Sequence, residues 1–242
     1  MDKIKKLQEI LQSSNNIVFF GGAGVSTESG IPDFRSADGL YNQKSKIPPE
    51  VILSHNFFFD HTKEFYKFYF DKMLDLSIKP NDAHKQLAKW EKLGKLKAIV
   101  TQNIDGLHQL AGSKVVYELH GTVHKNRCTK CNKFFKAEDI IEFKGKGVPT
   151  CDCGGIIKPE VVLYNEGLDP ATINGAVEAI AQADTLIVAG TSLTVYPAAG
   201  LINYFRGKHL ILINRDITGK ESMAELVINE PVGKTLAQIN LK

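Results

Sequence analysis

The sequence predicts an α/β protein: a doubly wound parallel sheet with a smaller domain, formed by insertions, that contains helices and a cysteine-rich module. Three observations predict this class. Short apolar runs alternate along the chain with amphipathic helical patterns, which is typical of a parallel sheet covered on both faces. A glycine-rich loop directly follows the first of these runs. All four cysteines lie within one short window of the chain.

The apolar runs are continuous rather than alternating, so each is expected to be a strand that is buried on both faces. These predicted strands are Ile17–Phe20, Ala98–Thr101, Val115–Leu119, Leu186–Ala189 and Leu210–Ile213. The segments that separate them, and the charged N-terminal segment, include patterns with the spacing of amphipathic helices. The clearest of these between the strands are Ala83–Leu93, Thr172–Ala183 and Ala198–Phe205.

Two stretches interrupt the alternation of strands and helices. Residues 37–80 are rich in aromatic side chains and look helical, which we interpret as a local core rather than a stacking platform for bases. Residues 125–157 contain the four cysteines. The prediction is a main domain formed by residues 1–36, 81–124 and 158–242, and a small domain formed by the two insertions.

The composition is that of an ordinary globular protein, with 43% hydrophobic and 24% charged residues in a chain of 242. The net charge is only +3, and Lys and Arg are scattered rather than striped, so no direct nucleic-acid binding is expected. No apolar stretch approaches the roughly 20 residues of a membrane span, and the N-terminal segment lacks the apolar core of a signal peptide. We therefore expect a cytoplasmic protein without membrane contacts, whose thiols stay reduced.

The cysteines occur as a C-x-x-C pair, Cys128 and Cys131, and a C-x-C pair, Cys151 and Cys153. Clustered, reduced cysteines with this spacing predict one tetrahedral structural zinc site. Two disulfides or four unrelated thiols are the alternatives, and a reducing compartment disfavours both. The C-x-C spacing is unusual, but Gly154 and Gly155 follow it and allow the backbone to turn. Four thiolates leave no open position, so the metal is expected to stabilise the fold rather than act in chemistry.

The glycine-rich loop reads GGAGVSTESGIPDFRS over residues 21–36. Gly-x-Gly after a buried strand is typical of a site for a dinucleotide phosphate. The third glycine of the usual fingerprint is missing, since Thr27 stands in its place, and the motif alone is a weak signal. Hydride-transferring enzymes also have an acidic residue about 20 positions further on, at the end of a second strand. The sequence YNQKSK in that region lacks one, which disfavours a dehydrogenase.

Polar clusters follow all five predicted strands. They read GGAG, TQNID, YELHG, GTS and NR, in chain order. Ligands of open parallel sheets bind beyond the carboxyl ends of the strands. Any one cluster fits an ordinary turn or helix cap, but five at the same edge of the sheet predict a ligand site.

Several motifs together resemble those of the sirtuins, the Sir2 family of NAD-dependent protein lysine deacylases, of the bacterial type. These motifs are GAGVSTESGIPDFRS, TQNIDGLH, the HG of LHG, CTKC with CDC, KPEVVLY and GTSLTVYPAA. They span nearly the whole chain in the family's order. The resemblance implies a Rossmann-like NAD-binding main domain beside a helical and zinc-ribbon domain. It also implies transfer of the acetyl group of a protein lysine to ADP-ribose, which releases nicotinamide and O-acetyl-ADP-ribose.

The resemblance also implies roles for individual residues. His120 is the catalytic base toward a ribose hydroxyl, and Asn103 orients the ribose and a water. Asp105 accepts from the nicotinamide carboxamide, and Phe34 shields the ribose. The whole set of implied NAD contacts is Gly22, Ala23, Gly24, Ser26, Thr27, Asp33, Phe34, Arg35, Gln102, Asn103, Ile104, Asp105, His120, Gly190, Thr191, Ser192 and Asn214.

The segment KPEVVLYNE is the implied docking site for an extended acyl-lysine peptide, which adds to it as a β-strand. Its implied substrate contacts are Val161, Val162, Tyr164 and Asn165. Asn165 stands where the family usually has glycine, so its side chain is expected to reshape the peptide groove. Relatives that remove acidic acyl groups carry Tyr-x-x-Arg, whereas here Tyr69 is followed by Lys72, which favours an acetyl substrate.

Two other functions remain open from the sequence. An NAD-dependent protein ADP-ribosyltransferase would cleave the same glycosidic bond but modify a different acceptor. A binding module with an inert nucleotide fold would bind NAD without cleaving it. The intact set of His120, Asn103 and Asp105 favours an enzyme. His84 and His108 also match family positions and are expected to be structural, and His55, His61, His124 and His209 to be structural or on the surface.

Overall fold

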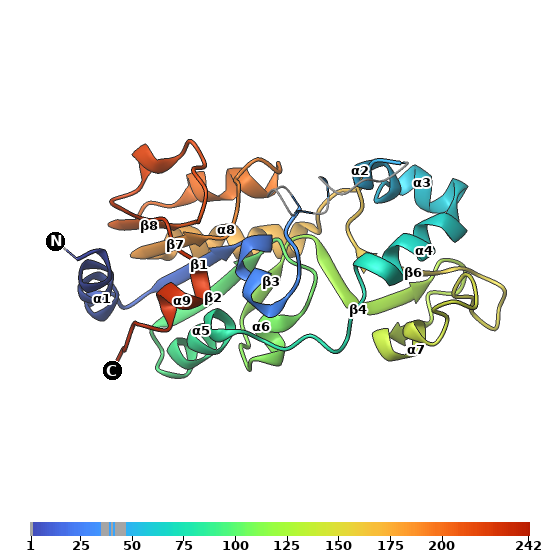
Figure 1. The fold of residues 1–242 in the computed structure, drawn as a ribbon, viewed down its shortest axis with the longest axis horizontal. Coiled ribbons are helices and arrows are strands. Elements are labelled where there is room, and N and C mark those ends of the chain that lie inside the picture. The colour runs from blue at the N-terminus through green and yellow to red at the C-terminus, as the bar shows by residue number, and fades with distance from the viewer. Residues whose placement is uncertain (1, 35–38, 40, 42–46) are drawn as a thin grey trace.

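The computed structural model describes residues 2–34, 39, 41 and 47–242. Its main unit is a six-stranded, fully parallel sheet with the strand order β3-β2-β1-β7-β8-β9 (Figure 1). The strands are β1 (Ile17–Gly21), β2 (Leu96–Thr101), β3 (Val116–Glu118), β7 (Thr185–Ala189), β8 (His209–Ile213) and β9 (Leu226–Ile228). The predicted α/β class with a doubly wound parallel sheet is confirmed.

Helices cover both faces of this sheet, and the reason is visible in β1. Ile17 and Phe19 belong to one hydrophobic core, and Val18 and Phe20 belong to a second core on the opposite face. Successive strand residues point to opposite faces, so a strand buried on both sides is apolar throughout. The first core packs against α1 (Lys3–Ser13), α5 (Asp82–Lys92) and α9 (Val232–Leu236). The second packs against α8 (Pro170–Gln182) and the 3₁₀ helix Ala198–Tyr204.

Two features of the sheet differ from the sequence prediction. The predicted helix Ala198–Phe205 is a 3₁₀ helix over Ala198–Tyr204. The edge strand β9 has only three residues, too few to give a recognisable pattern, and it was not predicted.

A second unit lies beside the carboxyl ends of the strands and contains a three-stranded antiparallel sheet with the order β5-β4-β6 (Figure 1). Its strands are β4 (Gly121–Cys128), β5 (Phe134–Lys136) and β6 (Ile157–Val161). Four helices pack with this sheet, namely α2 (Pro49–Ile52), α3 (His55–Asp60), α4 (Thr62–Lys72) and α7 (Ala137–Ile141).

The aromatic stripe predicted to form a local core does so. Phe58, Phe65 and Tyr66 are buried with Tyr69 in one cluster, and the Tyr66 hydroxyl donates to the carbonyl oxygen of Ile157 in β6. This cluster joins the helices of the first insertion to the small sheet. The domain boundaries stay a prediction, and β4 itself extends across the expected boundary at residue 124.

The remaining short helix, α6 (Leu107–Leu110), follows β2. Within the part of the chain that the structure describes, no helix combines the length and the apolar character needed to cross a membrane.

Candidate active site

A cavity of about 690 Å³ lies at the carboxyl ends of the strands and extends toward the small unit. Each of the five predicted strand ends contributes to its lining, through Ala23, Gln102, His120, Thr191 and Asn214. The strand order reverses between β1 and β7, and the clusters that follow these two strands meet there. This is the position at which ligands bind to doubly wound sheets.

Most of the predicted NAD and peptide contacts line this cavity. They are Ala23, Gly24, Ser26, Thr27, Asp33, Phe34, Gln102, Asn103, Ile104, Asp105, His120, Val161, Val162, Tyr164, Asn165, Gly190, Thr191, Ser192 and Asn214. Gly22 does not line it but packs beneath it against Thr191. Arg35 lies outside the described residues, so its predicted contact stays a prediction.

The glycine loop passes so close to the end of β7 that side chains have no room. The Gly24 amide donates to the carbonyl oxygen of Gly190 at 2.8 Å. A Cβ atom at Gly24 would lie 2.8 Å from Gly190 Cα, and one at Gly22 would lie 2.8 Å from Thr191 Cβ. Cβ atoms in proteins essentially never come this close to another heavy atom, so only glycine fits at these two positions of the motif.

The chain after this loop does not form the α-helix whose N-terminus usually holds the phosphate at a Gly-x-Gly motif. It forms two short 3₁₀ helices, Ala23–Val25 and Thr27–Ser29, instead of an α-helix. Thr27, in place of the third glycine, donates from its hydroxyl to the Gly24 carbonyl at 3.0 Å. A one-turn helix has a weak dipole, so the loop's individual amides must account for any anion binding.

A polar network lies on one wall of the cavity. The Ser26 hydroxyl donates to Asp105 Oδ2 at 2.6 Å, and Asn103 Nδ2 donates to Ser26 Oγ at 3.0 Å. Asp105 Oδ1 accepts from the Leu107 amide at 2.9 Å, at the start of α6. Asp105 thus fixes the backbone just before α6, whose N-cap position is Gly106, and it also lines the cavity. Ser26 is only 1% exposed, so this network holds the carboxylate in one position.

Thr191 forms a second group of hydrogen bonds in the cavity lining, with Asn214 and Gln102. The Thr191 amide donates to Asn214 Oδ1 at 2.9 Å, and Asn214 Nδ2 donates back to the Thr191 carbonyl at 3.2 Å. The Thr191 hydroxyl donates to Gln102 Oε1 at 2.9 Å. Gln102 Nε2 is buried without a hydrogen-bond partner among the described residues. A buried unpaired donor costs about 1–3 kcal/mol, so this side chain fits a ligand that brings an acceptor.

His120 is positioned as a proton acceptor. Its Nδ1 lies 2.9 Å from the carbonyl oxygen of Gln102. A carbonyl only accepts, so Nδ1 carries the hydrogen and Nε2 of the neutral ring is free of a proton. Burial lowers the pKa of His120, and the bond to Gln102 opposes this only in part. The imidazole is therefore neutral at pH 7 and is suited to general base catalysis.

The peptide segment, which we define as residues 161–165, lies beside this histidine. The Val162 amide donates to the carbonyl oxygen of His120 at 2.9 Å. Tyr164 pairs with the small unit, since its amide donates to the Leu53 carbonyl and its carbonyl accepts from the His55 amide, both at 2.9 Å. The segment is thus held between the candidate base and α3.

Asn165 has a φ of 70°, which explains the glycine that the family usually has there. Glycine adopts this left-handed region without strain, and asparagine is among the few other residues that enter it readily. The substitution therefore preserves the backbone turn. Asn165 lines the cavity, and the expected effect of its side chain on the peptide groove stays a prediction.

Tyr69 and Lys72, the pair compared with Tyr-x-x-Arg, are in different surroundings. Tyr69 is 1% exposed within the aromatic cluster of the small unit, and burial raises its pKa. Lys72 lines the cavity, whereas Tyr69 does not. A hydroxyl and a cation at the predicted spacing therefore do not face the cavity together.

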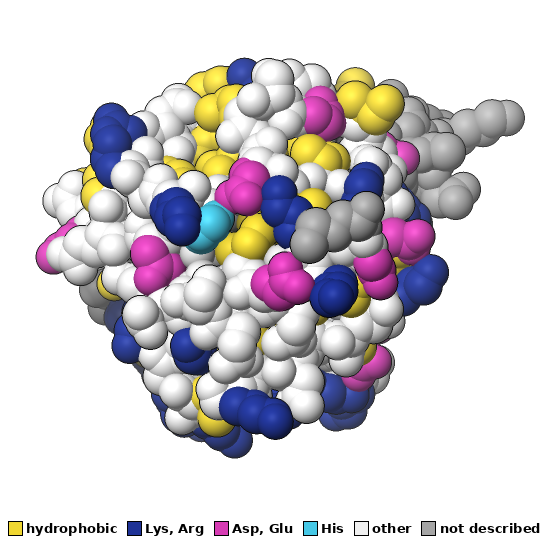
Figure 2. Space-filling model, turned by 90° about the vertical axis from the view of Figure 1, so that its left-hand side faces the viewer, with side chains coloured by type: hydrophobic (Ala, Val, Ile, Leu, Met, Phe, Trp, Pro, Cys, Tyr) yellow, Lys and Arg dark blue, Asp and Glu magenta, His cyan; other side chains and the backbone are white. Residues whose placement is uncertain are grey.

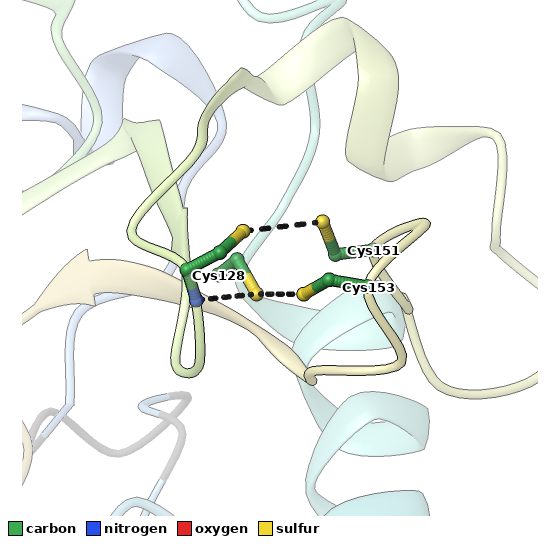
Figure 3. A group of neighbouring side chains, drawn as sticks. Cys128, Cys151 and Cys153 are labelled. Carbon is green, nitrogen blue, oxygen red and sulfur yellow. Dashed lines mark hydrogen bonds between the residues drawn. The ribbon is translucent and has the colours of Figure 1, made fainter.

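The four cysteine sulfurs lie within 4.8 Å of one another, and none forms a disulfide. The sulfurs of Cys128 and Cys153 are 3.4 Å apart, and those of Cys131 and Cys151 are 3.7 Å apart. Figure 3 shows the side chains of Cys128, Cys151 and Cys153 turned toward one another. A tetrahedral zinc ion with Zn–S bonds of about 2.3 Å separates its ligands by about 3.8 Å, so the cluster fits zinc.

The histidines that were expected to be structural do not line the cavity. His84 and His108 are buried with ring centroids 4.7 Å apart, and burial lowers the pKa of both, that of His84 to about 4. His124 has a role that the sequence did not reveal, because its Nε2 lies 2.9 Å from the carbonyl oxygen of Asp105. His124 therefore holds the turn that presents Asp105 to the cavity.

Three further residues near the cavity were not predicted as site residues from the sequence. Arg215 lines it and donates to Asp33 at 3.5 Å, although the sequence indicated only that a polar pair follows β8. Glu28 accepts from the amides of Gly233 and Lys234 and so anchors the glycine loop to α9. Asn81 Nδ2 donates to the Val25 carbonyl at 2.8 Å and anchors the same loop to α5. Such contacts join distant parts of the chain and have no local sequence signal.

Comparison with known proteins gives concordant results. A family model described as "Sir2 family" matches residues 22–197. The "NAD-dependent protein deacetylase" of Clostridium perfringens (strain 13 / Type A) is 62% identical over 242 residues, covering 98% of each chain. That of Clostridium acetobutylicum is 60% identical, covering 99% of this chain and 98% of the relative.

Solved structures agree with these sequence matches. A structure described as "Sir2-p53 peptide-NAD+" has a TM-score of 0.86 and 39% identity, and the match covers 96% of this chain and 95% of that one. A second, "Sir2 bound to acetylated peptide", has a TM-score of 0.85 and 37% identity, with the same coverage. With a family model that matches most of its length, and with relatives this similar over their whole length, the chain belongs to the Sir2 family.

Proposed function

We propose that the cavity binds NAD and an acetyl-lysine peptide, and that the protein removes acetyl groups from protein lysine side chains. The products are the free lysine, nicotinamide and O-acetyl-ADP-ribose. The observation that carries this proposal is the geometry around His120: a neutral imidazole lies in the same cavity as the Ser26–Asn103–Asp105 network and next to the peptide segment.

The residues of the cavity fit NAD. The glycine loop meets the residues that follow β7 at the switch point of the sheet, where the pyrophosphate of a dinucleotide usually binds, and Thr191 and Asn214 are placed for the adenosine half. The unpaired Gln102 Nε2 and the fixed carboxylate of Asp105 are complementary to polar groups of the ribose and the carboxamide. When bound, NAD supplies a glycosidic bond whose cleavage provides the driving force and the acceptor for the acetyl group.

The protein contributes positioning and one proton transfer. Ser26 and Asn103 fix Asp105, so the wall that faces the nicotinamide end needs no rearrangement during the reaction. His120 takes a proton from a ribose hydroxyl and returns it later, while its Nδ1–H stays bonded to the Gln102 carbonyl. Phe34, which lines the cavity, excludes water from the reacting centre.

The substrate is an acetylated protein or peptide, bound in extended form along the peptide segment. Val161 is the last residue of the edge strand β6 of the small sheet and Val162 follows it, and an edge strand offers main-chain groups for pairing. Acetyl is favoured over acidic acyl groups because Tyr69 does not reach the cavity. The protein is not expected to bind nucleic acid directly, since its net charge is only +3. On the face that Figure 2 shows, acidic side chains occur among the basic ones.

The four cysteines hold one structural zinc ion, remote from the proton transfer. All four are thiols in the structure, and thiolate ligands of this kind persist in a reducing compartment. This supports a cytoplasmic location, and we expect no membrane partner.

Mass spectrometry of an acetyl-lysine peptide incubated with the purified protein tests the function. Loss of the acetyl group only in the presence of NAD, together with O-acetyl-ADP-ribose, is the expected result. A peptide that instead gains the mass of ADP-ribose indicates the ADP-ribosyltransferase. Unchanged NAD in the presence of a folded, zinc-loaded protein indicates a binding module and contradicts the proposal.

A further inference from the structure

Glu166, the residue directly after the peptide segment, is the centre of a mostly buried ionic network. Its side chain is 19% exposed, as is that of Lys158. Glu166 Oε2 accepts from Lys158 Nζ at 3.1 Å and from the Leu163 amide at 2.9 Å. Its other oxygen, Oε1, lies 2.9 Å from His55 Nδ1. One carboxylate thus contacts the segment itself, strand β6 and helix α3.

Lys158 extends this network to the start of the segment. Besides bonding Glu166, its ammonium donates to the carbonyl oxygen of Val161 at 3.2 Å and lies 5.8 Å above the Phe58 ring. The ion pair therefore ties Val161 at one end of the segment to Leu163 in its middle. We call Lys158 and Glu166, with these two bonds to the segment, the ionic staple.

The staple also fixes the segment relative to the candidate base. Between the two stapled residues lies Val162, whose amide donates to the carbonyl oxygen of His120. A shift of the segment would therefore change the distance between the segment and His120, whose imidazole is the candidate base. A peptide strand that pairs with the segment takes its register and depth from this backbone.

A negative charge at Glu166 is essential for this arrangement. Burial by itself raises the pKa of Glu166, but the Leu163 amide, His55 and Lys158 outweigh it, so that the pKa lies below its usual value. The carboxylate is thus ionised at neutral pH. Replacing one member of a buried ion pair by a neutral group leaves the other charge uncompensated, which is more disruptive than losing an exposed pair.

We propose that Glu166 is a positioning residue for the acetyl-lysine peptide, acting through the main chain of Val161–Leu163. This inference rests on the proposed function. Glutamine at this position keeps the shape and one acceptor oxygen but loses the charge, so the segment is expected to loosen, while the Ser26–Asn103–Asp105 network, which makes no contact with Glu166, stays intact.

The test compares Glu166→Gln with Glu225→Gln. Glu225 also pairs with a lysine and a histidine, Lys6 and His209, but it is more exposed and does not line the cavity, so its substitution removes ion pairs away from the segment. We expect the peptide KM of Glu166→Gln to rise about tenfold, equivalent to about 1.4 kcal/mol, while the KM for NAD and both constants of Glu225→Gln change less than about twofold. Hydrogen exchange of the Leu163 amide is expected to accelerate in Glu166→Gln alone.

A double-mutant cycle measures the interaction between Lys158 and Glu166, which a general loss of stability would not produce. With Lys158→Met, the Glu166→Gln substitution no longer leaves a buried cation unpaired, so its effect on the peptide KM is expected to shrink. An unchanged peptide KM in Glu166→Gln, or equal increases for peptide and NAD, overturns the inference. If the wild-type protein deacetylates no acetyl-lysine peptide, the proposed function is contradicted instead. In that case, hydrogen exchange of the Leu163 amide that is the same in Glu166→Gln and in the wild type overturns the ionic staple as well.

Discussion

Gly190 directly follows β7 and contacts the backbone of the glycine loop, which makes it a sensitive test of how the NAD subsite is built. Its φ is 59°, in the left-handed region. A Cβ atom there would lie 2.4 Å from the Val25 amide nitrogen and 2.7 Å from the Gly24 carbonyl carbon. Gly190→Ala therefore introduces both backbone strain and a clash with backbone atoms that cannot move independently.

The two effects can be separated with Gly219, which has a φ of 75° but no heavy atom within 4 Å of its Cβ position. Left-handed backbone costs a residue with a Cβ about 1–2 kcal/mol, and this is the whole expected effect of Gly219→Ala. Overpacking adds about 1–3 kcal/mol, so Gly190→Ala is expected to lower the free energy of unfolding by about 2–5 kcal/mol.

Urea unfolding of both variants, without NAD, measures this difference, and the KM for NAD shows its effect on the site. We expect Gly190→Ala to be less stable than Gly219→Ala and to have the higher KM, because the glycine loop must move away from β7. If the two variants lose the same free energy and bind NAD equally well, the close approach at Gly190 does not shape the site and the reasoning is refuted.

Three further predictions concern the site and the metal. Because the pKa of His120 is lowered and the base must be neutral, kcat/KM is expected to stay constant from pH 8 to about 6.5 and to fall only at lower pH; a decline that begins above pH 7 contradicts this. Ser26→Ala removes the hydrogen bonds of Ser26 to Asp105 Oδ2 and Asn103 Nδ2 and is expected to raise the KM for NAD about tenfold, whereas Ser29→Ala removes a buried hydroxyl without a partner among the described residues and should leave this KM unchanged. Metal analysis is expected to find a single zinc ion per chain, and Cys151→Ser to lower both the zinc content and the melting temperature; full stability of a zinc-free protein contradicts a structural metal.

The sheet could be predicted because burial on both faces leaves a plain trace in the sequence. Val18 and Phe19 point to opposite cores, and both are apolar, so the strand reads as one continuous run. The five strand ends could be assigned to one crevice for a similarly simple reason, since parallel strands end at the same edge. In contrast, β9 has only three residues, and its position depends on pairing with β8 rather than on its own pattern.

The fine structure of the site could not be predicted, because it depends on contacts between distant segments. Glu28 meets the start of α9 more than 200 residues away, and Asn81 meets the glycine loop from the start of α5. The reason for glycine or asparagine at position 165 became clear only from its positive φ. The role of Glu166 likewise depends on Lys158 and His55, which the sequence does not pair with it.

The central claim is that His120 acts as the base in a reaction that transfers the acetyl group to ADP-ribose. The most direct measurement is the amount of deacetylated peptide and of O-acetyl-ADP-ribose formed by wild-type protein and by His120→Ala at saturating NAD. The account predicts equal amounts of the two products for the wild type, and a loss of both by about a hundredfold or more in the variant. Deacetylation that proceeds at the wild-type rate in His120→Ala, or without NAD, would contradict it.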